Sequence, residues 1–257
     1  MLFEVRGVVL RSVDLGESDR IITVYTKERG LISVMVKGAR SLKNRNMAAS
    51  QLFCYSDMVI YSRADKLYLR ESSIIESFFK LRSSIEGLAL AQYIAEVLSE
   101  VGTADPEEEL LRLALNSLFA IAEKKYPLEV IKCAFELRSL AIIGFMPDVL
   151  ACRECGEREG EFYFDIMSGN IECYACAQKR SARREDTDDG EVRRIAILSA
   201  GAKIALGYIV HSPIERIFSF KLSPEDMSLL ARSAEEYLLN QLERSFKSLE
   251  FYNEVKR

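Results

Sequence analysis

Four of the six cysteines stand in two closely spaced pairs in the second half of the chain. They are Cys152 and Cys155, then Cys173 and Cys176, in the pattern C-x2-C-x17-C-x2-C. Each C-x2-C places two thiols on one tight turn, and two such turns make a tetrahedral cage of four sulfurs. The residues between the pairs read as a strand and a turn, which is typical of a zinc ribbon. We therefore expect this motif to bind one zinc ion.

The expected zinc is structural rather than catalytic. Four protein thiolates leave no open position for water or a substrate. The ion would hold together a small insertion over residues 150–178. Two disulfides are the alternative, but they do not suit a reducing cytoplasm. Direct contact of the ribbon with DNA stays open, because Arg153, Arg158 and Lys179 lie nearby.

A basic segment near the start of the chain is the second candidate site. Four cations and no carboxylate occur over residues 37–45. Its glycine and small polar residues let the backbone approach a ligand closely, and phosphates are the natural target of such a loop. A merely solvated loop is the alternative, and the absence of a counter-charge favours binding. The candidate nucleic-acid-binding residues are Lys37, Gly38, Arg40, Lys43 and Arg45.

The charge of the chain is unevenly distributed. The net charge of -4 does not by itself suggest a nucleic-acid partner. Residues 1–80, however, carry 13 Lys and Arg against 9 Asp and Glu, a net of +4, which leaves -8 for the rest. A basic part on an acidic body suggests an anionic partner for the first 80 residues, with chance variation as the alternative.

Several sequence features argue against an enzyme and against a membrane protein. No Gly-Lys dipeptide occurs, so the nucleotide-binding P-loop is excluded. The sequence has a single histidine, His211, which argues against a catalytic triad or a metal centre built on histidines. No apolar run reaches the roughly 18 residues of a membrane helix, and the N-terminus does not have the pattern of a signal peptide. We expect a soluble cytoplasmic binding protein.

The first 80 residues have the pattern of β structure. Five short strands in so small a domain favour a closed or partly closed barrel, because closure removes exposed strand edges. An OB-type barrel can hold single strands on its aromatic side chains, and an SH3-like barrel is the main rival. The expected strands are 3–13, 21–26, 31–36, 52–62 and 67–75.

Helical spacing begins at Leu81 and defines a second expected domain, residues 81–257. Asp105-Pro106 and Ser223-Pro224 are typical helix starts, and Pro127 opens a further helix. The polar stretch 179–191 reads as a connector. The expected fold is thus α+β: an N-terminal five-stranded barrel, then a helical domain with an inserted four-cysteine motif.

These pieces, in this order, resemble the RecO family of bacterial recombination and DNA-repair proteins. The stretches that carry the likeness are DRIITVYT (19–26) leading to RGLI (29–32), VKGAR (36–40), FELR (135–138), GFMP (144–147), CRECG (152–156) and GNIECYAC (169–176). The resemblance implies that the barrel is of the OB type. By the same resemblance, Lys37 and Arg40 are the first candidates for phosphate contacts, with Lys43 and Arg45 in support.

The resemblance also implies a function and partners. RecO-like proteins bind single- and double-stranded DNA and anneal complementary strands. With RecR they help load RecA onto DNA coated by single-strand-binding protein, whose acidic C-terminal tail they bind. A nucleoid-associated location in the bacterial cytoplasm follows. The alternatives are an RNA-binding transcription or translation factor with a zinc ribbon and an OB fold, and a scaffold that docks a peptide.

Overall fold

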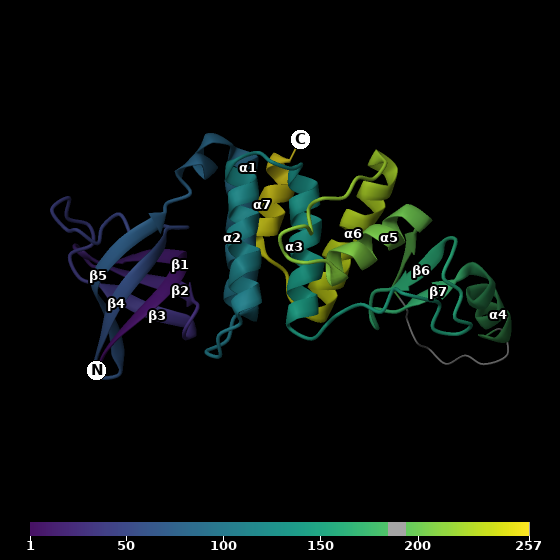
Figure 1. Ribbon diagram of the computed structural model, residues 1–257, viewed down its shortest axis with the longest axis horizontal. Coiled ribbons are helices and arrows are strands. Elements are labelled where there is room, and N and C mark those ends of the chain that lie inside the picture. The colour runs from purple at the N-terminus through teal and green to yellow at the C-terminus, as the bar shows by residue number, and fades with distance from the viewer. Residues whose placement is uncertain (185–193, 257) are drawn as a thin grey trace. The chain divides into compact units, whose positions relative to one another are not determined.

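The computed structural model describes residues 1–184 and 194–256 (Figure 1). It contains two compact units. One comprises Met1–Lys125 and the C-terminal segment from Phe246, and the other is Tyr126–Ser245. The barrel therefore shares its unit with helices, and the predicted domain boundary at residue 80 stays a prediction. No helix among the described residues is both long and apolar enough to cross a membrane.

The N-terminal strands form a closed barrel in the order β1-β2-β3-β5-β4. Strands β3 and β5 pair in parallel, and the other neighbouring pairs, including β1 with β4, are antiparallel. This order is that of an OB-type barrel, so the predicted fold is confirmed and the SH3-like rival is wrong. The strands are β1 (Leu2–Leu15), β2 (Asp19–Thr26), β3 (Gly30–Val36), β4 (Tyr55–Arg63) and β5 (Lys66–Glu76).

Alternating apolar residues fill the barrel, because successive side chains on a strand point to opposite faces. The chain between β3 and β4 also contributes to this core. Ala39, in the middle of the basic segment, is completely buried and anchors that segment to the barrel. The core consists of Val5, Val9, Ile22, Val24, Val34, Val36, Ala39, Met58, Ile60 and Leu69.

Three α-helices and one short 3-10 helix complete the first unit. They are η1 (Phe79–Ser83), α1 (Ile85–Val101), α2 (Glu108–Ala122) and α7 (Lys247–Val255). Figure 1 shows α7 beside α1, to which its N-terminal end is bound. The rings of Tyr93 and Phe246 meet edge to face at 5.7 Å, and the Ser248 N–H donates to Glu96 Oε2 at 3.1 Å. Sequence reasoning missed this helix and took the preceding one for the last.

The barrel contacts the segment between α1 and α2. The Leu31 N–H donates to the Thr103 carbonyl at 2.8 Å, and the Tyr25 hydroxyl accepts from the Glu107 N–H at 3.3 Å. Gly30 has φ of 56°, and a Cβ there would lie 2.1 Å from the Thr103 oxygen. Only glycine fits this turn. Helix α2 is capped by Glu107 rather than by the expected Asp105.

The second unit combines helices with a small antiparallel sheet in the order β7-β6-β8. The Ser223 hydroxyl accepts from the Asp226 N–H at 3.1 Å and caps α6, with Pro224 at its first position, as predicted. The expected connector at 179–191 is wrong up to Arg184, which is helical, and the rest of it lies outside the described residues. The elements are α3 (Leu128–Ile142), β6 (Phe162–Asp165), β7 (Ile171–Cys173), α4 (Tyr174–Arg184), β8 (Ile195–Leu198), α5 (Ala200–His211) and α6 (Pro224–Gln241).

Candidate metal centre and nucleic-acid surface

The four predicted cysteines come together in the second unit. The four sulfur atoms all lie within 4.8 Å of one another, and the sulfurs of Cys155 and Cys173 are 3.7 Å apart. Tetrahedral zinc with bonds of about 2.3 Å requires sulfurs about 3.8 Å apart. The six cysteines of the chain are free thiols, so the alternative of two disulfides is wrong. The donor set and its spacing therefore fit one tetrahedral metal ion.

Backbone hydrogen bonds shape the first cysteine turn. The Gly156 N–H donates to the Cys152 carbonyl at 2.9 Å, and the Cys152 N–H donates to the Glu157 carbonyl at 2.7 Å. Gly156 has φ of 77°, a left-handed conformation that glycine adopts without strain. The second pair is carried by regular structure, because Cys173 ends β7 and Cys176 lies in the first turn of α4.

The two turns are also joined through sulfur. The Cys173 N–H donates to the Cys152 sulfur at 3.3 Å. Burial raises the pKa of Cys152, but the N–H donors of Cys173, Cys155 and Glu154 outweigh it, and the resulting pKa is about 7. The pKa of Cys176 is raised to about 12, chiefly by its contact with the Cys155 thiol. Binding of a cation would displace protons from such crowded thiols.

The basic segment does have counter-charges, which come from Asp14 near the end of β1 and Asp19 at the start of β2. Lys37 Nζ lies 2.6 Å from Asp19 Oδ2, and the Gly38 N–H donates to Asp19 Oδ1 at 2.9 Å. Arg40 Nε lies 3.6 Å from Asp14 Oδ2. The premise that no carboxylate balances this loop is therefore wrong for Lys37 and Arg40. Lys43 and Arg45 are exposed and form no ion pair within the described residues.

Two tyrosines lie side by side on the outer surface of the barrel next to this loop. Tyr61 on β4 pairs with Tyr68 on β5, and their rings stack with centroids 5.1 Å apart and an interplanar angle of 15°. Tyr68 also lies opposite Met35, two residues before Lys37. At the tip of this hairpin, Arg63 and Lys66 are exposed, again without an ion pair in the described part of the chain.

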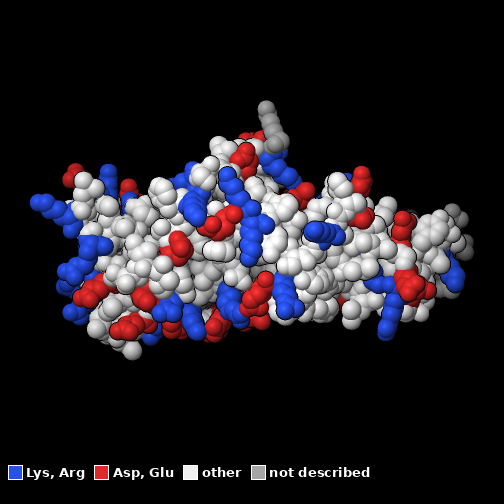
Figure 2. All heavy atoms as spheres, turned by 45° about the horizontal axis from the view of Figure 1, so that its top comes forward, with Lys and Arg blue, Asp and Glu red and all other residues white. Residues whose placement is uncertain are grey.

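Sequence reasoning noted these aromatic residues but could not choose among them. The pairing of Tyr61 with Tyr68 depends on the register of β4 against β5, which a bulge at Val59/Ile60 shifts. The register brings rings and cations to one end of the hairpin. Figure 2 shows Lys and Arg side chains gathered at the left-hand end of the barrel, with Asp and Glu among them.

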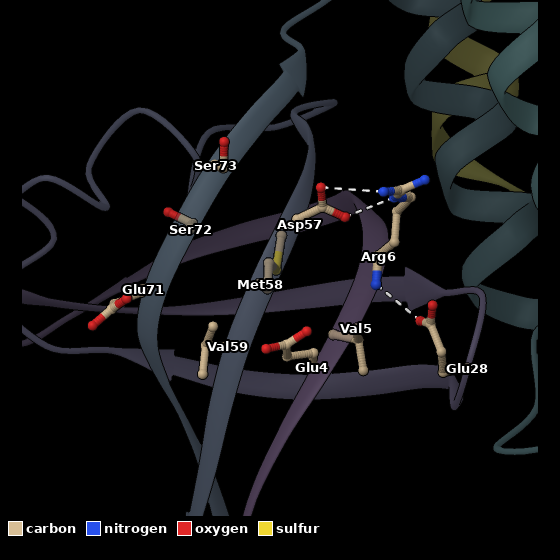
Figure 3. A pocket seen from close by; sticks show the side chains of 10 residues that line it. All are labelled: Glu4, Val5, Arg6, Glu28, Asp57, Met58, Val59, Glu71, Ser72 and Ser73. Carbon is tan, nitrogen blue, oxygen red and sulfur yellow. Dashed lines mark hydrogen bonds and ion pairs between the residues drawn. The ribbon is translucent and has the colours of Figure 1, made fainter.

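The middle of the same strands, next to the tyrosine pair, is acidic. A groove of about 520 Å³ crosses β1, β4 and β5, as Figure 3 shows. Its one cation, Arg6, is engaged by Asp57, 2.6 Å from its Nε. This groove would repel phosphate groups, so it limits a nucleic-acid surface to the end with Tyr61 and Tyr68. The groove is lined by Glu4, Val5, Arg6, Glu28, Asp57, Met58, Val59, Glu71, Ser72 and Ser73.

A closed OB-type barrel, followed by helices and a four-cysteine subdomain, defines a narrow class of proteins, and comparison with known proteins identifies the family. The family model for the N-terminal part of recombination protein O matches residues 1–78, and the model for its C-terminal part matches residues 82–250. The chain belongs to the RecO family.

Relatives agree with this assignment along the chain. DNA repair protein RecO of Acetivibrio thermocellus is 33% identical over 254 residues, which cover 98% of this chain and 96% of that protein. The protein of the same name from Symbiobacterium thermophilum is 30% identical over 260 residues, covering 99% and 98%. The one from Bacillus pumilus is 34% identical over 181 residues, covering 70% of each chain.

Proposed function

We propose that this protein is a non-enzymatic DNA-binding recombination mediator that anneals complementary strands. The observation that carries the proposal is the stacked pair of Tyr61 and Tyr68 beside Lys37, on an OB-type barrel of the RecO family. Rings and cations together suit single-stranded DNA, since bases stack on rings while cations follow the backbone. The names of the relatives, DNA repair proteins, support the same role.

The four cations of the loop would contribute unequally to phosphate binding. Lys43 and Arg45 form no ion pair within the described residues, so their full charge is available to attract a phosphate. Lys37 and Arg40 must instead break their ion pairs with Asp19 and Asp14 before they bind a phosphate. The loss of these ion pairs offsets part of the attraction to the phosphate. With about four phosphate contacts, log affinity for a single strand should fall with log salt at a slope near -3.

Annealing would require no bond cleavage. Cations on the barrel would lower the repulsion between two strands, and base pairing would supply the free energy. We propose that RecR and single-strand-binding protein, through its acidic tail, act as partners in loading RecA, and that the protein works in the bacterial cytoplasm. Double-stranded DNA would bind through the same phosphate contacts.

We propose zinc as the metal of the four-cysteine cluster. A set of four thiolates at tetrahedral spacing is the donor set that zinc prefers in structural sites, and it leaves no open position. The ion would supply cross-linking of the two cysteine turns. Its role would be to fix β7 and α4, which carry Cys173 and Cys176, on the rest of the second unit.

The test is strand annealing with the full-length zinc-loaded protein. Complementary oligonucleotides should anneal faster with the protein, both naked and coated by single-strand-binding protein. The double variant Lys43→Glu with Arg45→Glu should lose most of the acceleration, while Lys247→Glu, an exposed charge reversal on α7, should not. Equal rates with and without protein on both substrates would refute the annealing role, and preference for RNA would favour the RNA-factor alternative.

A further inference from the structure

A second open groove lies on the four-cysteine subdomain. It has a volume of about 810 Å³ and runs between α4 and the outer face of the sheet formed by β6 and β8. Neither the family assignment nor the barrel surface accounts for it. Its lining residues are mainly rings, aliphatic side chains and one arginine, and they include Tyr163, Tyr174, Arg180, Ile195 and Ile197.

The floor of this groove is apolar although it faces water. The rings of Tyr163 and Tyr174 stack at 6.2 Å with an interplanar angle of 27°. Tyr174 is 56% exposed, and Ile195 and Ile197 on β8 are 43% and 54% exposed. Ile197 pairs directly with Tyr163 across the sheet, so rings and aliphatic chains form one surface. Exposed apolar surface gathered in a groove marks an interaction site.

The wall of the groove is basic. Helix α4, Tyr174–Arg184, has four cationic residues and no carboxylate in its sequence. Arg180 donates three hydrogen bonds to Glu172, at 3.2, 2.9 and 2.6 Å, and Glu172 is itself buried. Lys179 does not line the groove, but it adjoins the lining residues Gln178 and Arg180 on α4, and it is exposed without an ion pair within the residues described. One arginine thus lines the groove with its charge offset by Glu172, and the exposed Lys179 adjoins the groove.

From this juxtaposition we propose that the groove between α4 and β8 is a second binding surface for single-stranded DNA. Bases would stack on the exposed face of Tyr174 and contact the isoleucines. Lys179 would meet a backbone phosphate directly, and Arg180 would do so in exchange for Glu172. The inference rests on the proposed function, because it assumes a DNA-binding protein. It deepens that function by giving one chain two strand-binding surfaces, one in each compact unit.

Nucleic acid fits the groove better than an acidic peptide does. Every nucleic-acid base can stack on the face of an aromatic ring, whereas the carboxylates of an acidic peptide cannot. A peptide with its own aromatic residues remains the competing occupant, and the experiment includes it. A metal ion bound by the four cysteines would also give the groove a rigid frame, because Cys173 and Cys176 stand at the start of α4.

The first experiment locates the bound strand. Oligothymidylate carrying bromodeoxyuridine is cross-linked by ultraviolet light to the full-length zinc-loaded protein, and the attached peptides are identified by mass spectrometry. We expect cross-links at Tyr174 or Tyr163 as well as on the barrel. Cross-links confined to residues 1–80 would overturn the second surface and leave the barrel proposal intact, whereas absence of any binding would refute both.

The second experiment measures affinity by fluorescence anisotropy. The double variant Tyr174→Ala with Lys179→Gln should bind a long oligothymidylate about tenfold more weakly, by loss of one stacking ring and one cation. The matched control Phe251→Ala with Lys247→Gln removes one exposed ring and one exposed cation from α7 and should bind normally. Zinc content and melting temperature verify that both variants are folded.

The same variants distinguish a DNA-binding site from a peptide-binding site. If the Tyr174 variant binds DNA normally but loses binding of a glutamate-rich peptide that carries aromatic residues, the groove is a peptide site and the proposal is overturned. If cross-linking at Tyr174 persists in the Lys43→Glu, Arg45→Glu barrel variant, the second surface stands independently of the first.

Discussion

Lys37 Nζ lies 2.6 Å from Asp19 Oδ2, directly beyond the paired ends of β2 and β3, where Arg20 lies opposite Val36. Asp19 also accepts the Gly38 N–H, so one carboxylate both neutralises the loop and shapes it. The hydrogen bonds from Lys37, first, and from Gly38 lower the pKa of Asp19. Any phosphate that binds Lys37 must compete with this carboxylate.

Replacing Asp19 with asparagine should therefore strengthen DNA binding. Asparagine keeps an oxygen that can accept the Gly38 N–H, so the loop keeps its shape while Lys37 loses its counter-charge. Affinity for single strands should rise, and the salt slope should steepen by less than the roughly 0.7 of a full added phosphate contact, because Lys37 already makes part of one in the wild type. Anisotropy titrations at several salt concentrations measure both. Asp57→Asn, which changes the net charge equally but lies in the acidic groove, should leave the slope unchanged.

Asp19 also predicts a dependence of stability on pH. Its folded-state pKa is lowered, so its stabilising contribution is present at neutral pH and is lost as the pH falls through that lowered value. The melting temperatures of wild type and Asp19→Asn should differ at pH 7. They should converge as the pH falls below about 4, the usual range of an aspartate. A constant difference down to pH 2 would contradict the role given to this carboxylate.

Gly30→Ala should destabilise the first unit. An added Cβ would lie 2.1 Å from the Thr103 oxygen, at a φ of 56°. We expect the free energy of unfolding to fall by about 2–4 kcal/mol, from strain and steric displacement. Gly16→Ala is the matched control, because Gly16 has φ of 61° with nothing within 4 Å of the added atom. It should cost only about 1–2 kcal/mol, as urea denaturation would show.

Lys132 forms a buried ionic cluster in the second unit. Its Nζ lies 2.7 Å from Glu136 Oε1 and 2.8 Å from Glu235 Oε2, and Glu136 is completely buried. Burial alone would lower the pKa of Lys132, but the two carboxylates outweigh it and raise the pKa. Lys132→Met should cost about 3–5 kcal/mol, because a buried carboxylate is left without its cation.

The double variant Lys132→Met with Glu136→Leu serves as the control for this cluster. It removes the buried pair together, and an apolar replacement of a buried pair is often close to neutral. Most of the lost stability should return. If the double variant is as unstable as the single one, lost packing rather than an uncompensated charge is the cause.

Removal of the metal should act locally. Chelation, or Cys152→Ala with Cys173→Ala, should expose β6, β7 and α4 to hydrogen exchange while the barrel stays protected. Cross-linking at Tyr174 should disappear, and cross-linking to the barrel should persist. If the whole chain loses protection together, the cluster supports more than its own subdomain. If metal-free protein keeps full protection over 150–178, the structural role is wrong.

The sequence alone determined the features that depend on neighbours along the chain. The cysteine spacing fixed which thiols meet, because each pair occupies one turn, and alternation along the first strands defined a barrel core. Helix starts with a capping residue and a proline, such as Ser223-Pro224, were also readable. Each of these follows from a few residues and a fixed repeat.

Only the tertiary structure decided what meets across long separations. Asp19 neutralises Lys37 because the antiparallel register of β2 and β3 brings their ends together, and the Tyr61 and Tyr68 rings stack because of the register of β4 and β5. Helix α4 was missed because its end is polar and basic, a composition equally typical of a connector, while its first turn is held at the cysteine cluster. Such contacts depend on how distant segments pack, and a local pattern does not encode that packing.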